Sequence, residues 1–393
     1  MSVNISYVGS QGHFLSASGA NPHNNNKLTS SWAALAGYNV ASGVATPCSG
    51  NACTAPLISQ KSTAANVALA TGLGFTPQNM YASSTSYYTG NNVYQYFVPF
   101  PQLSGLSDTT SFSGNTNYNA LQLTVRQRTS HGVDFMLNYT YSKAMDDVGG
   151  FRLPEQPRLD RSISVTDLPQ NLVGTAVYHL PFGHGHIGGD NFWVNALAGG
   201  WLISGIYTYH SGSPLSVSGS GCGGSSILGN CMPSMVQGVS VRNGTKYAKN
   251  VTANPSSSNY FAKISYLNFG AFSVANAGTT AQYGTACTAN AASATSQVCY
   301  VGNGPALYVP GNAPRVGAGN AWSMGAYNID MAIKRSFNIY REWKLQFEAD
   351  ALNATNHTVF GSINGGVGGS SYGYVTTVSN LPRDWQFSGR LSF

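Results

Sequence analysis

Two segments near the C-terminus carry carboxylates at alternate positions, the residue type that glycoside hydrolases use in pairs. Asp330 lies in one segment, and Glu348 and Asp350 lie in the other. The face on which alternation places these acids also carries cations: Arg126, Arg128, Lys334, Lys344 and Arg390. Salt bridges inside a polar lumen account for both signs of charge without catalysis. We therefore expect no catalytic residues and no enzyme activity.

Histidines and aspartates suggest two further sites, both of them weak. His184 and His186 could chelate a metal, but they sit in a glycine-rich turn, so we expect solvated histidines. Asp146 and Asp147 could bind calcium through their oxygens, yet at a strand end we expect ordinary solvated carboxylates. The chain has no HExxH or P-loop motif. We predict no metal and no cofactor.

The six cysteines form three local pairs in loops rich in glycine, serine, alanine and asparagine. The pairs are Cys48 with Cys53, Cys222 with Cys231, and Cys287 with Cys299. None has the CxxC spacing of a zinc site. An even number at short spacing predicts three disulfides made in an oxidising compartment, although free thiols remain the alternative.

The C-terminal segment alternates between apolar and polar residues. Large apolar side chains take odd positions and polar ones take even positions: Trp385, Phe387, Leu391 and Phe393 against Gln386, Ser388, Arg390 and Ser392. A β-strand points alternate side chains to opposite faces. In a transmembrane barrel one face meets lipid and the other meets a polar lumen. We therefore predict that these four apolar residues face lipid.

Seven other segments alternate in the same way, so we predict eight strands in all. The eight predicted strands, including the C-terminal one, are 3–8, 118–129, 133–142, about 171–180, 201–210, 327–337, 344–352 and 385–393. The fourth is the least regular, since Leu172, Val173, Ala176 and Val177 blur its pattern. On the polar faces we expect seven lumen-facing residues: Arg126, Arg128, Asp330, Lys334, Glu348, Asp350 and Arg390.

Composition agrees with a β-protein that has long polar loops. Only 8% of the 393 residues are charged, against roughly 25% in average domains, while 46 are glycine and 23 are tyrosine. No stretch approaches the roughly 18 apolar residues of a membrane-spanning helix. The net charge of +6 is scattered, which argues against nucleic-acid binding.

The predicted connections are short on one side and long on the other, as in outer-membrane barrels. Residues 130–132, 338–343 and about 181–200 would form the periplasmic side. The extracellular loops would be about 9–117, 143–170, 211–326 and 353–384, and the two longest hold all six cysteines. We thus expect residues 1–393 to form a single partial barrel domain in the bacterial outer membrane.

Several motifs along these strands are similar to Oar-like TonB-dependent receptors. They start at Val3, Asn117, Asn138, Gly200, Ile329 and Leu345, and they read VNISYVGSQGHFL, NYNALQLTVRQR, NYTYSKAMDD, GWLISGIYTYHSGSPL, IDMAIKRSF and LQFEADALNATNH. They occur in the family's order. The loops show no such resemblance.

The resemblance implies the C-terminal part of a barrel of about twenty-two strands, with a function in ligand binding or uptake. The family's plug, TonB-contacting segment and signal peptide have no counterpart in this sequence. The expected partners are therefore outer-membrane lipid, the barrel-assembly machinery, the missing N-terminal strands and plug, and TonB only through that missing part. Two alternatives remain open: a self-contained eight-stranded barrel and a secreted, disulfide-bearing β-rich adhesin.

Overall fold

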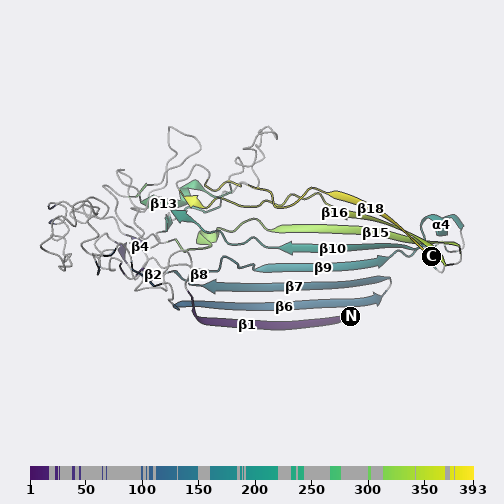
Figure 1. The fold of residues 1–393 in the computed structure, drawn as a ribbon, viewed down its shortest axis with the longest axis horizontal. Coiled ribbons are helices and arrows are strands. Elements are labelled where there is room, and N and C mark those ends of the chain that lie inside the picture. The colour runs from purple at the N-terminus through teal and green to yellow at the C-terminus, as the bar shows by residue number, and fades with distance from the viewer. Residues whose placement is uncertain are drawn as a thin grey trace, which may run out of the picture.

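The protein is described by a computed structural model, in which neighbouring strands lie side by side as one broad meander (Figure 1). The structure describes residues 1–16, 112–130, 132–148, 160–183, 192–219, 313–340, 342–367 and 377–393, with isolated shorter stretches elsewhere. A membrane-crossing helix is absent from the described residues.

Eight long strands run antiparallel in the order β1-β6-β7-β9-β10-β15-β16-β18. Their bounds are β1 Ser2–Leu15, β6 Gly114–Ser130, β7 Val133–Asp146, β9 Gln170–His179, β10 Trp201–His210, β15 Ala326–Tyr340, β16 Trp343–Leu352 and β18 Asp384–Ser392. Each predicted strand corresponds to one of them. The predicted all-β, antiparallel outer-membrane fold is confirmed.

Several short elements accompany the long strands. They are β2 His23–Asn24, β3 Tyr38–Asn39, β4 Val44–Ala45, β5 Ser107–Asp108, β8 Ser162–Ile163, α4 Phe192–Leu197, β11 Ser218–Gly219, β12 Ser234–Met235, η6 Phe269–Ala271, β13 Phe272–Ala275, β14 Tyr300–Val301, η7 Ala318–Asn320 and β17 Gly366–Val367. Helix α4 lies in the β9–β10 connection, which we predicted only as a periplasmic link. It is found at the end of the sheet with the short turns (Figure 1).

Several strands extend beyond their predicted limits. β1 continues to Leu15 and pairs with β6 as far as Gly114, with a register shift after Gly12. The alternation of apolar residues stops at Val8, yet the backbone of the glycine, serine and glutamine residues that follow still pairs. The loop predicted to begin near residue 9 therefore begins after β1 ends. β7 likewise reaches Asp146, four residues past the predicted end.

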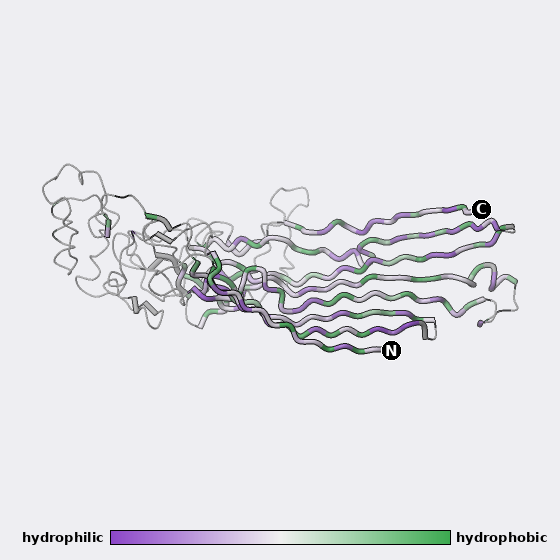
Figure 2. Tube along the Cα trace, turned by 60° about the horizontal axis from the view of Figure 1, so that its bottom comes forward, coloured by the Kyte–Doolittle hydropathy of each residue, from purple (hydrophilic) through white to green (hydrophobic). Residues whose placement is uncertain are grey.

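The sheet is open among the described residues. β1 pairs with β6 and β18 pairs with β16, and no ladder joins β1 to β18. The tight turn between β6 and β7 is made at Gly132, whose φ of +78° suits glycine. Along much of the long strands, hydrophobic and hydrophilic residues alternate (Figure 2). This two-sidedness decides which side chains of the long strands share a face.

Candidate functional site: the two faces of the sheet and its ends

The strand register gathers the large apolar side chains on one face, here called the apolar face. Its members are Val3, Ile5, Tyr7, Leu121, Leu123, Val125, Phe135, Leu137, Tyr139, Tyr141, Leu172, Tyr178, Trp201, Ile203, Tyr207, Tyr209, Ile329, Met331, Ile333, Leu345, Phe347, Trp385, Phe387 and Leu391. In β9 the register resolves the blurred pattern, because Leu172 falls on this face while Val173 falls on the other. The apolar face runs unbroken from β1 to β18.

The residues that we predicted to face lipid lie on the apolar face. Trp385 stands opposite Ala351, Phe387 opposite Ala349 and Leu391 opposite Leu345. Phe393, beyond the last paired residue, places its ring 5.3 Å from that of Trp343. Phe387 is 66% exposed, so its ring is not covered by protein in this chain. Contact with lipid itself stays a prediction.

The opposite face, here called the polar face, carries the residues that we predicted to face the lumen. Register places Arg126, Asp330, Lys334, Glu348, Asp350 and Arg390 there, and Arg128 follows Arg126 by alternation. Lys334 and Glu348 are directly opposite each other and form an ion pair of 3.7 Å. The Asp330 carboxylate accepts from the backbone N–H of Asn353 at 2.8 Å. The polar face thus holds one ion pair among the described residues, and the expected salt-bridge network of a lumen stays a prediction.

The cation Arg335 departs from this division. Arg335 lies on the apolar face, opposite Trp201 and Phe347, and is only 7% exposed. Its guanidinium lies 4.3 Å from the ring centre of Phe337 and donates to the backbone oxygens of Asn195 and Leu197. We did not single out Arg335 from the sequence. Its odd-numbered position, next to Lys334 on the other face, was the available signal.

Buried carboxylates collect at the end of the sheet that carries the long loops. Asp146 forms an ion pair with Arg315, and Asp147 accepts from the side chain of Asn115 at 3.2 Å. Both aspartates are 6% exposed. Our expectation of solvated carboxylates at these positions was wrong. The longer β7 and the segment around Arg315 enclose them, and their partners make them structural.

A third buried acid, Asp167, ties the β8–β9 connection to β7. Its carboxylate accepts from the backbone N–H of Ala144 at 2.7 Å. Burial raises the pKa of Asp167 above its ordinary value, and the Ala144 hydrogen bond and the charge of Lys143 only partly oppose that rise.

The long connections form a small hydrophobic core of their own at the same end. It consists of Val217, Val241, Leu267, Ala271, Phe272, Ala313, Ala318, Ala321, Ile363, Val367, Tyr372 and Val375. We call this set the loop core. Phe272 and Tyr372 meet edge to face at 6.3 Å. β11 and β17 pair across it, so the described residues of the connections 211–326 and 353–384 share one packed unit.

One glycine is essential to the packing of the loop core. Gly373 has a φ of +74°, and a Cβ there would come within 2.9 Å of the Leu267 side chain and backbone. Its carbonyl oxygen accepts from the backbone N–H groups of Tyr266 and Leu267. Any larger residue would both strain this turn and separate the two connections. Burial also raises the pKa of Tyr372 in this core.

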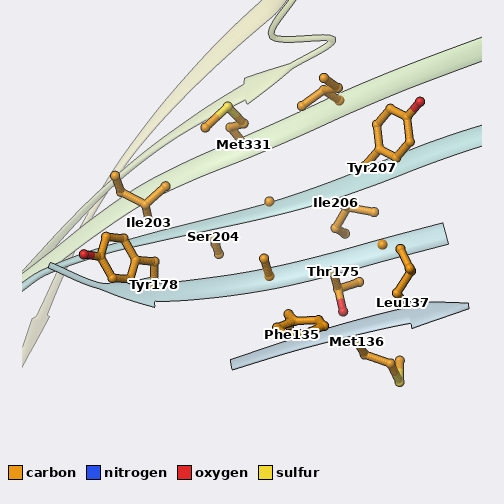
Figure 3. A pocket seen from close by; sticks show the side chains of 14 residues that line it. Phe135, Met136, Leu137, Thr175, Tyr178, Ile203, Ser204, Ile206, Tyr207 and Met331 are labelled. Carbon is orange, nitrogen blue, oxygen red and sulfur yellow. The ribbon is translucent and has the colours of Figure 1, made fainter. Parts of the chain in front are cut away.

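The apolar face is hollowed where β9 and β10 cross its middle. Figure 3 shows the hollow, which has a volume of about 390 Å³ and lies among residues such as Phe135, Tyr178, Ile203, Tyr207 and Met331. Gly174 and Gly205 form its floor, and a methyl group on either would meet nothing closer than 3.4 Å. The missing side chains therefore create the hollow. On an apolar face, such a space suits hydrocarbon rather than a polar substrate.

The described residues include no group of three or more metal-ligating side chains that could hold an ion. His186 is exposed, and its backbone N–H donates to Gly183 in the β9–β10 connection. His184 and all six cysteines lie outside the described residues, so the three predicted disulfides stay predictions.

Comparison with known families gives one match to this two-faced sheet. A family model described as an outer membrane beta barrel domain matches residues 1–386. A search of curated proteins found no match.

Proposed function

We propose that this chain, which belongs to the outer membrane β-barrel family and lies in the bacterial outer membrane, is the barrel segment of a surface receptor that binds or takes up a ligand. The observation that carries the proposal is the loop core. Connections of the predicted external side pack into one folded unit instead of lying separately on the strand ends. A fixed loop platform is what a binding surface requires.

The two faces of the sheet support the membrane part of this proposal. The apolar face would meet lipid, and the charged residues of the polar face would line the lumen. Lys334 and Glu348 are already paired with each other, and Asp330 is engaged by the backbone of Asn353. We accordingly propose a non-catalytic role, in which these acids hold the barrel wall together.

The finer proposal is a TonB-dependent, Oar-like receptor. It rests on the sequence motifs along the strands and on the open edges of β1 and β18. In hydrocarbon each unpaired backbone group costs several kcal/mol, so both edges need partners. We propose that additional strands of a larger barrel supply them, that the barrel-assembly machinery inserts the whole, and that TonB acts through a plug outside these residues.

A self-contained eight-stranded barrel is the second candidate, and eight long strands favour it, since eight suffice to close with a lumen filled by side chains. That arrangement would require β18 to pair with β1. Membership of the outer-membrane family disfavours the third alternative, a secreted adhesin.

The test uses the complete gene product in its own outer membrane and the periplasmic domain of TonB as the probe. We expect the two proteins to crosslink in intact cells and to copurify after detergent extraction. Inactivating the TonB gene and deleting the receptor gene should produce the same nutritional or surface phenotype. A barrel that assembles normally, never contacts the TonB domain and has a phenotype independent of TonB would exclude the energised receptor.

A further inference from the structure

We propose that the β9–β10 connection is an interfacial anchor, in which α4 lies in the headgroup region of the inner, phospholipid leaflet and inserts its aromatic side chains among the acyl-chain ends. This inference rests on membership of the outer-membrane family and is independent of the ligand that the loops bind. It gives a function to a segment that neither the strand pattern nor the loop core explains.

The first observation is that α4 presents large apolar side chains outward. Phe192 is 73% exposed, Trp193 68% and Leu197 70%. The Phe192 and Trp193 rings meet edge to face with centres 5.4 Å apart, so they form one aromatic unit. Apolar area left in water is unfavourable in proportion to its extent. We therefore expect an apolar partner to cover the exposed apolar area of this six-residue helix.

The second observation is where the helix is fastened. The Arg335 guanidinium donates from Nη1 to the Leu197 oxygen and from Nη2 to the Asn195 oxygen, each at 2.9 Å. The Trp201 indole N–H also donates to the Leu197 oxygen, at 2.8 Å. Arg335 and Trp201 both belong to the apolar face. The C-terminal end of α4 is therefore bound to the apolar face of the sheet.

These bonds suit an environment of low polarity. The last carbonyls of a helix have no partner within it, and leaving them bare near hydrocarbon is costly. A cation at this end also interacts favourably with the helix dipole. The Arg335 guanidinium in turn contacts the rings of Trp201 and Phe337, at 5.5 and 4.3 Å from their centres. The Arg335 guanidinium and the carbonyl oxygens of Asn195 and Leu197 are thus hydrogen-bonded to each other at the edge of the apolar face.

The third observation is the compactness of the connection. Gly183 and Gly199 lie so close that a Cβ on Gly183 would come within 2.8 Å of the Gly199 Cα. Arg335, Trp201 and this glycine contact together hold α4 in one place. Trp343 and Phe393 stand at the same end of the sheet. Aromatic residues at such a level are typical of the membrane–water interface, and a short helix with aromatic residues outward extends that belt.

The test places a photoreactive benzophenone amino acid at position 192, and separately at 193, in the complete gene product. Purified outer membranes are irradiated, and the peptides are analysed by mass. We expect adducts that carry the mass of a phospholipid. The matched control places the same probe at Thr208, an exposed residue of the polar face, where we expect loss of the lipid adduct.

Two results would overturn the proposal. Adducts from positions 192 and 193 to a polypeptide alone would mean that α4 docks on a protein, whether a second copy or a periplasmic partner. Absence of any adduct at both positions, in protein that migrates as a folded barrel on unheated gels, would mean that α4 lies in water. Either result leaves the receptor proposal untouched, because that proposal depends on the TonB probe.

Discussion

Single residues on the terminal strand alternate between two environments. Leu391 is paired with Leu345 on the apolar face, whereas Ser392 is paired with Lys344 on the polar face. We expect Leu391→Arg to impair membrane assembly, at a cost of about 2–4 kcal/mol if the site lies near the midplane. Ser392→Arg should be far milder. The folded band on unheated gels measures both, and equal tolerance of the two changes would contradict the assignment of the faces.

Burial separates the two ion pairs of the described residues. Arg315 and Asp146 have side chains 13% and 7% exposed, while those of Lys334 and Glu348 are 38% and 29% exposed. Removing one partner of a buried pair leaves an uncompensated charge and costs about 3–5 kcal/mol. An exposed pair contributes about 0–1 kcal/mol.

We therefore expect Arg315→Met to destabilise the loop end strongly, and Lys334→Met, as the matched control, to have little effect. Susceptibility of the β7–β8 connection to protease added to intact cells is the measurement. Similar cleavage rates for both variants and the parent would show that the Asp146 pair is not structural.

Asp167 gives stability a definite dependence on pH. Its pKa in the folded protein is raised by burial, so the folded state binds a proton more tightly than the unfolded state. Stability therefore increases as pH falls from the raised pKa toward the ordinary value of 3.8. Above the raised pKa, the penalty for the buried charge is fully present.

The matching variant is Asp167→Asn, which keeps an acceptor oxygen for the Ala144 N–H but does not titrate. We expect the unfolding free energy of the parent, relative to this variant, to rise on acidification through that window. Urea unfolding at a series of pH values measures it. A parent that loses stability relative to the variant as pH falls would contradict the burial argument.

At the scale of elements, the three cysteine pairs define three small loops within the long connections. We expect Cys48 to pair with Cys53, Cys222 with Cys231, and Cys287 with Cys299, because short spacing makes local closure the least costly in chain entropy. Peptide mapping of unreduced protein from the cell surface decides this. Free thiols, or crosslinks between different pairs, would refute the local pattern.

Element boundaries were predictable only where side chains alternate. The predicted segment 201–210 coincides with β10, since its apolar residues mark each step. β1 is longer than predicted because its backbone pairing with β6 continues through Gly9 and Gly12. Glycine has no side chain that could indicate which face it belongs to. Helix α4 was not foreseen, because six residues are too few to display a helical period.

At the scale of the whole molecule, the open sheet has two edges that a membrane does not tolerate. We expect residues 1–393 expressed alone to aggregate, whereas the complete gene product inserts. The direct check replaces Ser6 of β1 and Ser388 of β18 with cysteine in the complete gene product, where the predicted outcome is no intramolecular crosslink between them. A stable monomer in which the two strands crosslink would establish a closed eight-stranded barrel.

The sequence by itself determined the eight long strands, the two faces and the long-loop asymmetry. Alternation with a period of two is visible in consecutive residues and needs no distant contact. The charges of Lys334, Glu348 and Asp350 could likewise be assigned to one face by parity. Tertiary structure alone decided that Asp146 meets Arg315, far along the chain, and that the outer connections share Phe272 and Tyr372 in one core. It alone also decided that Arg335 reaches α4. Such contacts depend on which distant segments the folded sheet brings together, and this cannot be read from neighbouring residues in the sequence.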